Sequence, residues 1–264
     1  TLEIRNAGQR REDNPELVDM VYARLNRKGY LRRDCQRLIH QDRNVYAASL
    51  VASGQADAMV TGLTRAFGSC FEDVLKVVDP AENQRIMTHA MFIRRGQTVF
   101  LADTSVAENP DGRALADIAI QTANTARSLG FEPRVALLSY SNFGSANGRD
   151  AEKVREAVAI LHAEHPDLIV DGEMQANVAL NNELSEELFP FSNLRGRKVN
   201  TLIFPNLAAG NIAYKLIQEM GGFEVVGPVL LGLQKPFHIL QMGSSVREIV
   251  DMVRIAAVDA QITR

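Results

Sequence analysis

The chain has 264 residues, 46% of them hydrophobic, and its 29 basic and 32 acidic side chains give a net charge of −3. This length and composition predict one large domain or two lobes with a substantial buried core, and the balanced charge argues against a nucleic-acid-binding surface. Cys35 and Cys70 form neither a metal-binding spacing nor a disulfide framework, which predicts a reduced, cytoplasmic protein. The longest apolar runs, such as 225–233, are too short to cross a bilayer, and the start shows no signal-peptide pattern.

The first 80 residues predict helices around one short strand. A strand-like run at 2–5 precedes Asn14-Pro15, where a capping residue and a proline predict a helix that ends near residue 29. Apolar spacing predicts further helices at 31–40, 42–53 and 68–78, and a short buried strand at 58–60. The helix at 31–40 is basic, which we interpret as a solvated face, with phosphate binding as the alternative.

From residue 86 onward, strands and helices alternate. Two runs, 86–94 and 97–102, predict a hairpin around Arg95-Gly96. Further strands are predicted at 135–138, 168–170, 201–204 and 225–231, and helices at 112–129, 150–161, 175–181, 211–220 and 246–260. The last helix opens with a capping box, Ser245-Val-Arg-Glu248. This alternation predicts a mostly parallel sheet covered by helices.

Two strand–loop–helix units carry the clearest signal for binding. A small, polar loop at 141–148 follows the strand at 135–138, and a loop at 205–210 follows the strand at 201–204. The second helix would be capped by Asn211, with a buried face formed by Ile212, Leu216, Ile217 and Met220. Such loops expose backbone N–H groups beside a helix N-terminus, where anions bind. An ordinary turn is the alternative, because neither loop has a dinucleotide or P-loop signature.

His162 and His165 lie one helical turn apart and could ligate a metal. Pro166 follows directly, however, and no third ligand is near in the sequence. We therefore predict no metal site and interpret the pair as imidazoles that interact with a helix C-terminus.

Several motifs resemble those of the phosphate acetyltransferase/butyryltransferase family. They are Ala58-Met-Val-Thr-Gly62, Ala136-Leu-Leu-Ser-Tyr-Ser141, Gly144-Ser-Ala146, Asp171-Gly-Glu-Met-Gln175 and Phe204-Pro-Asn-Leu-Ala-Ala-Gly-Asn-Ile-Ala-Tyr-Lys215. The resemblance runs from Asn14 to Gln261. More narrowly, residues 22–42 and His238-Ile-Leu-Gln-Met-Gly243 resemble the C-terminal acetyltransferase-like domain of bacterial NADP-dependent hybrid malic enzymes. The family's opening strands and helices before the Leu2 region are absent, which is consistent with a piece of a longer polypeptide.

The resemblance implies an α/β fold of two lobes, with mostly parallel sheets flanked by helices and a cleft between the lobes. Lobe I would be discontinuous, made of residues 1–82 and 232–264 and lacking its N-terminal part. Lobe II would comprise residues 83–231, and both loops described above would line the cleft. The resemblance also implies a homodimer within a larger homo-oligomer, and the charge balance and short apolar runs predict no nucleic-acid or membrane partner.

Acetyl transfer between phosphate and coenzyme A requires a base for the thiol, a polar group that orients it and cations that hold the phosphoryl oxygens. By resemblance, Gln241 replaces the family's thiol-orienting serine, Met242 its phosphate-binding arginine and Glu248 its aspartate base. Glu72 falls where active members carry a further arginine. Methionine cannot neutralise phosphate and Glu72 would repel it, so these positions predict no turnover. Glu248 retains a carboxylate that could still act as the base, and its place in the capping box explains a glutamate at this position equally well.

The resemblance and the loops together imply an acetyl-CoA or phosphate site with nine contacts. These are Ser141, Gly144, Ser145, Asn206, Gly210, Asn211, Lys215, Arg24 and Arg65, with a surface role equally open for both arginines. The implied function is a regulatory acetyl-CoA-binding domain of an NADP-dependent malic enzyme, which converts malate to pyruvate and CO2. NADP and a divalent metal, Mg or Mn, would bind a separate catalytic domain of the same polypeptide. The alternatives are an active phosphate acetyltransferase, which makes acetyl phosphate and CoA from acetyl-CoA and phosphate, and a dimerisation module without a ligand.

Overall fold

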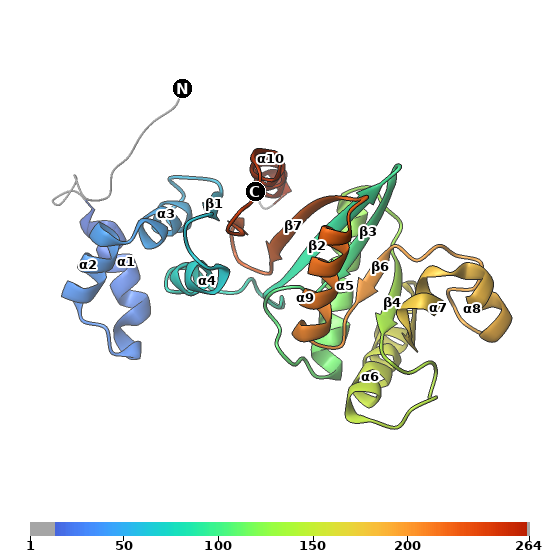
Figure 1. Cartoon of the computed structure of the whole chain (residues 1–264). Helices are drawn as coiled ribbons and strands as arrows, with labels where there is room; N and C mark the ends of the chain where they lie inside the picture. The colour runs from blue at the N-terminus through green and yellow to red at the C-terminus, as the bar shows by residue number, and fades with distance from the viewer. Residues whose placement is uncertain (1–13, 263–264) are drawn as a thin grey trace. The chain divides into compact units, whose positions relative to one another are not determined.

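The computed structural model describes residues 14–262 and divides the chain into two compact units (Figure 1). Unit 1 comprises Thr1–Glu82 and Gly232–Arg264, and unit 2 comprises Asn83–Leu231. The strand expected at 2–5 lies outside the described residues. None of the helices within 14–262 is long and apolar enough to cross a membrane.

Unit 1 contains helices and a two-stranded parallel sheet. Its elements are α1 (Pro15–Leu25), the 3-10 helix η1 (Asn26–Lys28), α2 (Arg32–Gln41), α3 (Arg43–Ala52), β1 (Met59–Gly62), α4 (Phe67–Leu75), β8 (Phe237–Leu240) and α10 (Val246–Ile262). Pro15 lies in the first turn of α1, and the Asp42 carboxylate accepts the first N–H groups of α3, from Asn44 and Val45. The helices predicted in this region are confirmed to within a few residues.

Unit 2 is built on a six-stranded sheet in the order β5-β4-β6-β3-β2-β7. The strands are β2 (Met87–Arg94), β3 (Gln97–Ala102), β4 (Arg134–Leu138), β5 (Ile169–Met174), β6 (Thr201–Ile203) and β7 (Glu224–Leu231). Strands β5, β4, β6 and β3 run parallel, whereas β2 is antiparallel to both of its neighbours. The predicted hairpin of β2 and β3 and the mostly parallel sheet are therefore confirmed.

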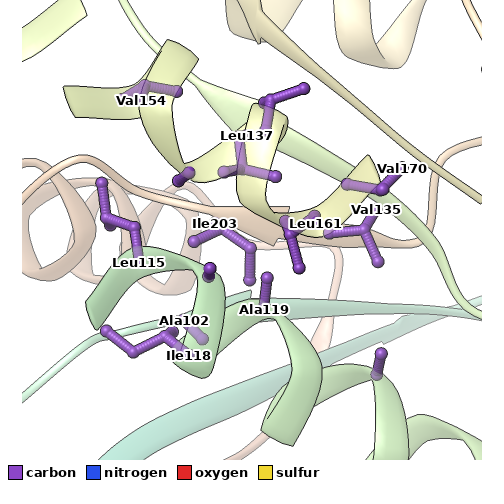
Figure 2. Packing of buried hydrophobic residues seen from close by; sticks show 14 of the residues in the cluster. Ala102, Leu115, Ile118, Ala119, Val135, Leu137, Val154, Leu161, Val170 and Ile203 are labelled. Carbon is purple, nitrogen blue, oxygen red and sulfur yellow. The ribbon is translucent and has the colours of Figure 1, made fainter. Parts of the chain in front are cut away.

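Helices cover both faces of this sheet. On one face α5 (Gly112–Ser128) and α6 (Arg149–Glu164) pack against the strands, and Figure 2 shows Leu115 and Leu161 from these helices beside Leu137 and Ile203 from the sheet. On the other face lie α7 (Ala176–Leu180), α8 (Asn182–Leu188) and α9 (Leu207–Met220). Burial of each large aliphatic side chain contributes roughly 1.5–3 kcal/mol, so two-sided covering is the main source of stability in this unit.

The predicted start and buried face of α9 are wrong. The helix begins at Leu207, because the Asn206 side chain accepts the N–H of Ala209 and caps it. Its buried face is formed by Gly210 and Tyr214, whose ring lies 5.8 Å from that of Phe92. The apolar stripe Ile212, Leu216 and Met220 is instead 59%, 55% and 84% exposed, and Ile217 is half-buried. Helix α8 was not predicted, because its only buried residue is Ser185 and it shows no apolar stripe.

Candidate functional site

The carboxyl ends of the parallel strands β3, β4 and β6 meet at one edge of the sheet in unit 2. Strand β4 leads into α6 on one face, whereas the neighbouring strand β6 leads into α9 on the other. The sheet therefore has a topological switch point between β4 and β6. In open α/β sheets, ligands bind in the crevice outside the carboxyl ends of the strands at such a point.

A cavity of about 730 Å³ opens at this edge. It is lined by the first turns of α9, by the loop after β3 and by the start of α6, through Asn206, Leu207, Ala208, Asn211, Ile212, Glu108, Asn109 and Asp150. No lysine or arginine is among the described residues that line it. Lys153 lies nearby, but its Nζ donates to Asn109 Oδ1 at 2.7 Å and pairs with Asp150 Oδ1 at 3.3 Å. The lining therefore favours neutral polar and apolar groups over phosphate.

The loop between β4 and α6 contains Ser141, Gly144 and Ser145, and the N–H groups of residues 141–146 are already hydrogen-bonded within the unit. Gly144 N donates to Glu173 Oε1 at 2.8 Å, and Ala146 N donates to Ser141 Oγ at 3.0 Å. Asn142 N donates to Ser145 Oγ at 2.9 Å, and Ser145 N donates to the carbonyl oxygen of Asn142 at 3.0 Å. The expectation of free N–H groups is therefore wrong for residues 141–146, where the Glu173 carboxylate on the neighbouring strand β5 accepts the N–H of Gly144 in place of a ligand anion.

The buried carboxylate of Glu173 accepts three hydrogen bonds through Oε1. The donors are Ser141 Oγ at 2.7 Å, Gly144 N at 2.8 Å and Arg155 Nη1 at 2.8 Å, and the Glu173 side chain is 1% exposed. Within the described residues, Oε2 is buried without a hydrogen-bond partner. Burial raises the pKa of Glu173, but the hydrogen bonds from Gly144, Ser141 and Arg155 outweigh it and lower the pKa below its usual value. Glu173 therefore stays ionised and holds the loop in place.

Sequence reasoning missed Glu173 and Arg155. Glu173 lies in the motif at 171–175, beyond the predicted strand at 168–170 but inside the observed β5. A buried glutamate carboxylate requires hydrogen-bond donors, and Arg155 in α6 supplies one of them. That requirement was the one signal that could have revealed the pair.

The four predicted contacts at α9 have different surroundings. Asn206 and Asn211 line the cavity, although Asn206 caps the helix and Asn211 Nδ2 donates to the carbonyl oxygen of Thr104 at 3.0 Å. Gly210 packs so closely on the sheet that a Cβ there would overlap the carbonyl oxygen of Asp103. Lys215 does not line the cavity; its Nζ lies 4.5 Å from the centre of the Tyr214 ring and donates to Gln218 Oε1 at 3.1 Å. The structure thus brings Asn206 and Asn211 together at the crevice.

Arg24 and Arg65 lie in unit 1, and carboxylates engage both. Arg24 pairs with Asp79 and donates to the carbonyl oxygens of Leu75, the last residue of α4, and Val78 at 3.1 and 2.7 Å. Arg65 Nη1 lies 2.6 Å from Asp42 Oδ2 and 2.9 Å from Asp73 Oδ2.

The pair formed by Asp42 and Arg65 is electrostatically favourable. Burial raises the pKa of Asp42, but hydrogen bonds from Arg65 and from the N–H groups of Val45 and Asn44 outweigh it and hold the pKa below its ordinary value. An anion would have to compete with these carboxylates for either arginine.

The positions expected from the resemblance to replace the family's reactive residues also lie in unit 1. Gln241 and Met242 directly follow β8, and Met242 is 64% exposed. Glu248 accepts the N–H of Ser245 at 2.6 Å and donates its own N–H to Ser245 Oγ at 3.3 Å, which confirms the predicted capping box. Glu72 lies in α4.

The histidine pair at the end of α6 was considered as a metal site. His162 Nε2 lies 3.0 Å from the carbonyl oxygen of Val170. No cluster of three potential metal ligands occurs among residues 14–262.

Comparisons with known proteins agree with this architecture. The family model described as phosphate acetyl/butaryl transferase matches residues 2–257. The NADP-dependent malic enzyme of Rhizobium meliloti (strain 1021) is 47% identical over 243 residues, which cover 92% of this chain and 32% of that protein. The phosphate acetyltransferase of Bacillus subtilis (strain 168) is 36% identical over 246 residues, which cover 92% of this chain and 76% of that protein.

The solved structure of a phosphotransacetylase from Streptococcus pyogenes has a TM-score of 0.84 and 32% identity, covering 96% of this chain and 77% of that one. The chain spans about a third of the length of the malic enzymes it matches. Because the family model covers nearly the whole sequence and the fold is that of the phosphotransacetylases, this chain belongs to the phosphate acetyl/butaryl transferase family.

Proposed function

We propose that this chain is a regulatory, acetyl-CoA-binding domain of a longer NADP-dependent malic enzyme and that it does not itself transfer acetyl groups. One observation carries the proposal. The cations expected around phosphate are either replaced, by Met242 and Glu72, or engaged by carboxylates of their own unit, as for Arg24 and Arg65. The similarity to malic enzymes over 92% of the chain supports the choice of parent protein.

The charges around Arg65 explain why phosphate would bind poorly there. Arg65 faces two carboxylates, Asp42 and Asp73, and Lys76 Nζ lies 2.8 Å from Asp73 Oδ1. Two positive and two negative charges leave this cluster neutral, so it offers no excess field to a phosphoryl group. Transfer of an acetyl group to phosphate requires such a field where charge develops in the transition state. A binding domain without turnover has no such requirement.

The crevice in unit 2 suits the uncharged part of coenzyme A. The pantetheine arm carries amide groups on a flexible chain, and the cavity offers the amides of Asn109, Asn206 and Asn211 beside the apolar Leu207 and Ile212. The carboxylates at the same edge, Glu108 and Asp150, would repel the phosphates of coenzyme A and leave them in solvent. We propose that the acyl-pantetheine arm occupies this crevice.

Regulation by this ligand requires a difference in affinity between two states. Acetyl-CoA inhibits malate oxidation only if it binds the inhibited arrangement of the parent enzyme more tightly than the active one. Malate should then weaken acetyl-CoA binding to the same extent. In this proposal NADP and the divalent metal bind the separate catalytic domain of the polypeptide.

Calorimetry and a coupled assay with acetyl phosphate and coenzyme A test the proposal. We expect acetyl-CoA to bind and no turnover to occur, with the Bacillus subtilis phosphate acetyltransferase as the active control. Turnover on the order of 10 per second would establish the working enzyme instead. Absence of binding would favour the dimerisation module, for which the exposed stripe Ile212, Leu216 and Met220 is the supporting feature.

A further inference from the structure

Three asparagine side chains line the crevice at the carboxyl edge of the sheet in unit 2, and one end of each amide is engaged. Asn206 Oδ1 accepts a backbone N–H of α9 at 2.9 Å, and Asn109 Oδ1 accepts from Lys153 Nζ at 2.7 Å. Asn211 Nδ2 instead donates to the carbonyl oxygen of Thr104 at 3.0 Å. These partners fix the orientation of each amide, because an N–H group or an ammonium requires an oxygen, whereas a carbonyl requires an N–H group.

The other ends of the three amides determine what the crevice recognises. They are the NH₂ groups of Asn109 and Asn206 and the Oδ1 atom of Asn211, and within residues 14–262 they form no hydrogen bond. Leu207 and Ile212 add apolar surface beside them. The crevice thus offers two donor groups, one acceptor and an apolar wall. Its complement is an uncharged ligand with carbonyl oxygens, an N–H or O–H group and an aliphatic chain.

The first turn of α9 does not supply an anion site. Anions bind at helix N-termini through N–H groups that have no other partner. Here Leu207 N donates to the carbonyl oxygen of Glu108 at 3.1 Å. Ala209 N and Gly210 N donate to Asn206 at 2.9 and 3.1 Å. These N–H groups are therefore already satisfied and do not attract a phosphate group.

The charges of the crevice also disfavour phosphate. The carboxylates of Glu108 and Asp150 line it, and Lys153 Nζ lies 3.3 Å from Asp150 Oδ1. Two carboxylates and one ammonium leave a net negative charge beside the amides. The phosphates of a nucleotide are therefore repelled at this edge rather than bound.

We propose that the crevice recognises the pantetheine thioester itself and that the nucleotide end of coenzyme A adds no affinity. The inference rests on the proposed function and specifies its ligand class. The amide carbonyl oxygens of the pantetheine arm match the NH₂ groups of Asn109 and Asn206, and its N–H and hydroxyl groups match Oδ1 of Asn211. An acyl-pantetheine without a nucleotide is therefore a ligand in its own right.

Calorimetry on this chain with three compounds tests the inference. Acetyl-CoA and S-acetylpantetheine, which lacks the nucleotide, should bind with dissociation constants within about threefold of each other. Adenosine 3′,5′-bisphosphate, which represents the nucleotide end alone, should neither bind nor displace acetyl-CoA. A rise of about tenfold in NaCl concentration should not weaken acetyl-CoA binding, because salt screens only a repulsion at this site.

A matched pair of variants tests the donor group. Asn109→Asp keeps the oxygen that accepts from Lys153 but replaces the NH₂ group by a second acceptor. It should weaken binding of the uncharged S-acetylpantetheine by about tenfold or more. Asn124→Asp makes the same change on α5, outside the lining, where Oδ1 accepts from Arg127 Nη1 at 3.2 Å, and it should leave the affinity unchanged.

The outcomes separate this inference from the proposed function. The inference is overturned, while the proposed function stands, if acetyl-CoA binds but S-acetylpantetheine binds more than about tenfold more weakly. Displacement of acetyl-CoA by adenosine 3′,5′-bisphosphate, or an S-acetylpantetheine affinity that Asn109→Asp leaves unchanged, would overturn it in the same way. Binding of neither thioester would overturn the proposed function as well.

Discussion

Replacement of Glu173 by glutamine should destabilise unit 2 more than any ordinary surface change. The glutamine keeps the shape and an acceptor at Oε1, so the donors Ser141, Gly144 and Arg155 retain a partner. The substitution removes the negative charge, and it places an amide N–H₂ where Oε2 is buried without a partner among the described residues.

The expected loss is about 3 kcal/mol. Hydrogen bonds to charged groups are worth roughly 1 kcal/mol more than neutral ones, and the gain at Arg155 is reduced because its side chain is 32% exposed. A buried amide without a partner costs about a further 1–3 kcal/mol. Glu187→Gln, the same change at an exposed position in α8, should alter the free energy of unfolding by less than about 0.5 kcal/mol.

Urea denaturation measures this difference, and its pH dependence checks the sign. The pKa of Glu173 is lower in the folded than in the unfolded chain, so its contribution is complete above the ordinary value of 4.5 and is lost as pH falls through the folded pKa. The gap between the wild-type chain and Glu173→Gln should therefore shrink below pH 4.5. Equal stability of the two proteins at pH 7 would refute the assignment of Glu173 as the anion that holds the loop.

Three further predictions concern the packing of α9, ligand binding and assembly. Gly210→Ala should lower the free energy of unfolding by about 1–3 kcal/mol, because the added Cβ would overlap the carbonyl oxygen of Asp103. In the same urea titration the control Gly68→Ala should be neutral or stabilising, because no neighbouring atom lies within 4 Å of a Cβ at that position. Asn211→Ala, which removes an amide from the cavity lining, should weaken acetyl-CoA binding several-fold in calorimetry, whereas Lys215→Ala, outside the lining, should leave the affinity unchanged. An unchanged affinity of Asn211→Ala would place the ligand elsewhere. The chain should sediment as a dimer that Leu216→Glu weakens, because Leu216 is 55% exposed in an apolar stripe, and a clean monomer at micromolar concentration would count against this prediction.

The architecture of unit 2 could be predicted because its strands and helices carry local signals. The apolar runs of β4 and β6 and the apolar stripes of α5 and α6 are readable within short windows of sequence. The buried face of α9 could not be read in this way. Its orientation is set by a long-range contact, the close approach of Gly210 to Asp103, which favours Tyr214 over the more hydrophobic Ile212 on the buried side.

The candidate site was predicted less well than the fold. The two loops were located correctly at the carboxyl ends of the strands. Whether a loop N–H or an arginine is free or already paired, however, depends on residues far away in sequence. Glu173 is 29 residues from Gly144, and Asp79 is 55 residues from Arg24. Gly144 has φ +90° and its N–H is already hydrogen-bonded, so a Gly144→Val substitution would strain the loop rather than block a ligand.

The most direct test of the central claim is one NMR titration of this chain into a mixture of acetyl-CoA and phosphate, observed through both ¹H and ³¹P signals. The account predicts that the acetyl and pantetheine resonances broaden or shift on binding, while the concentrations of acetyl-CoA and phosphate stay constant. The appearance of acetyl phosphate and free coenzyme A would contradict the claim that the domain is inactive. Acetyl-CoA resonances that remain unchanged at a stoichiometric excess of the chain would contradict the claim that it binds acetyl-CoA.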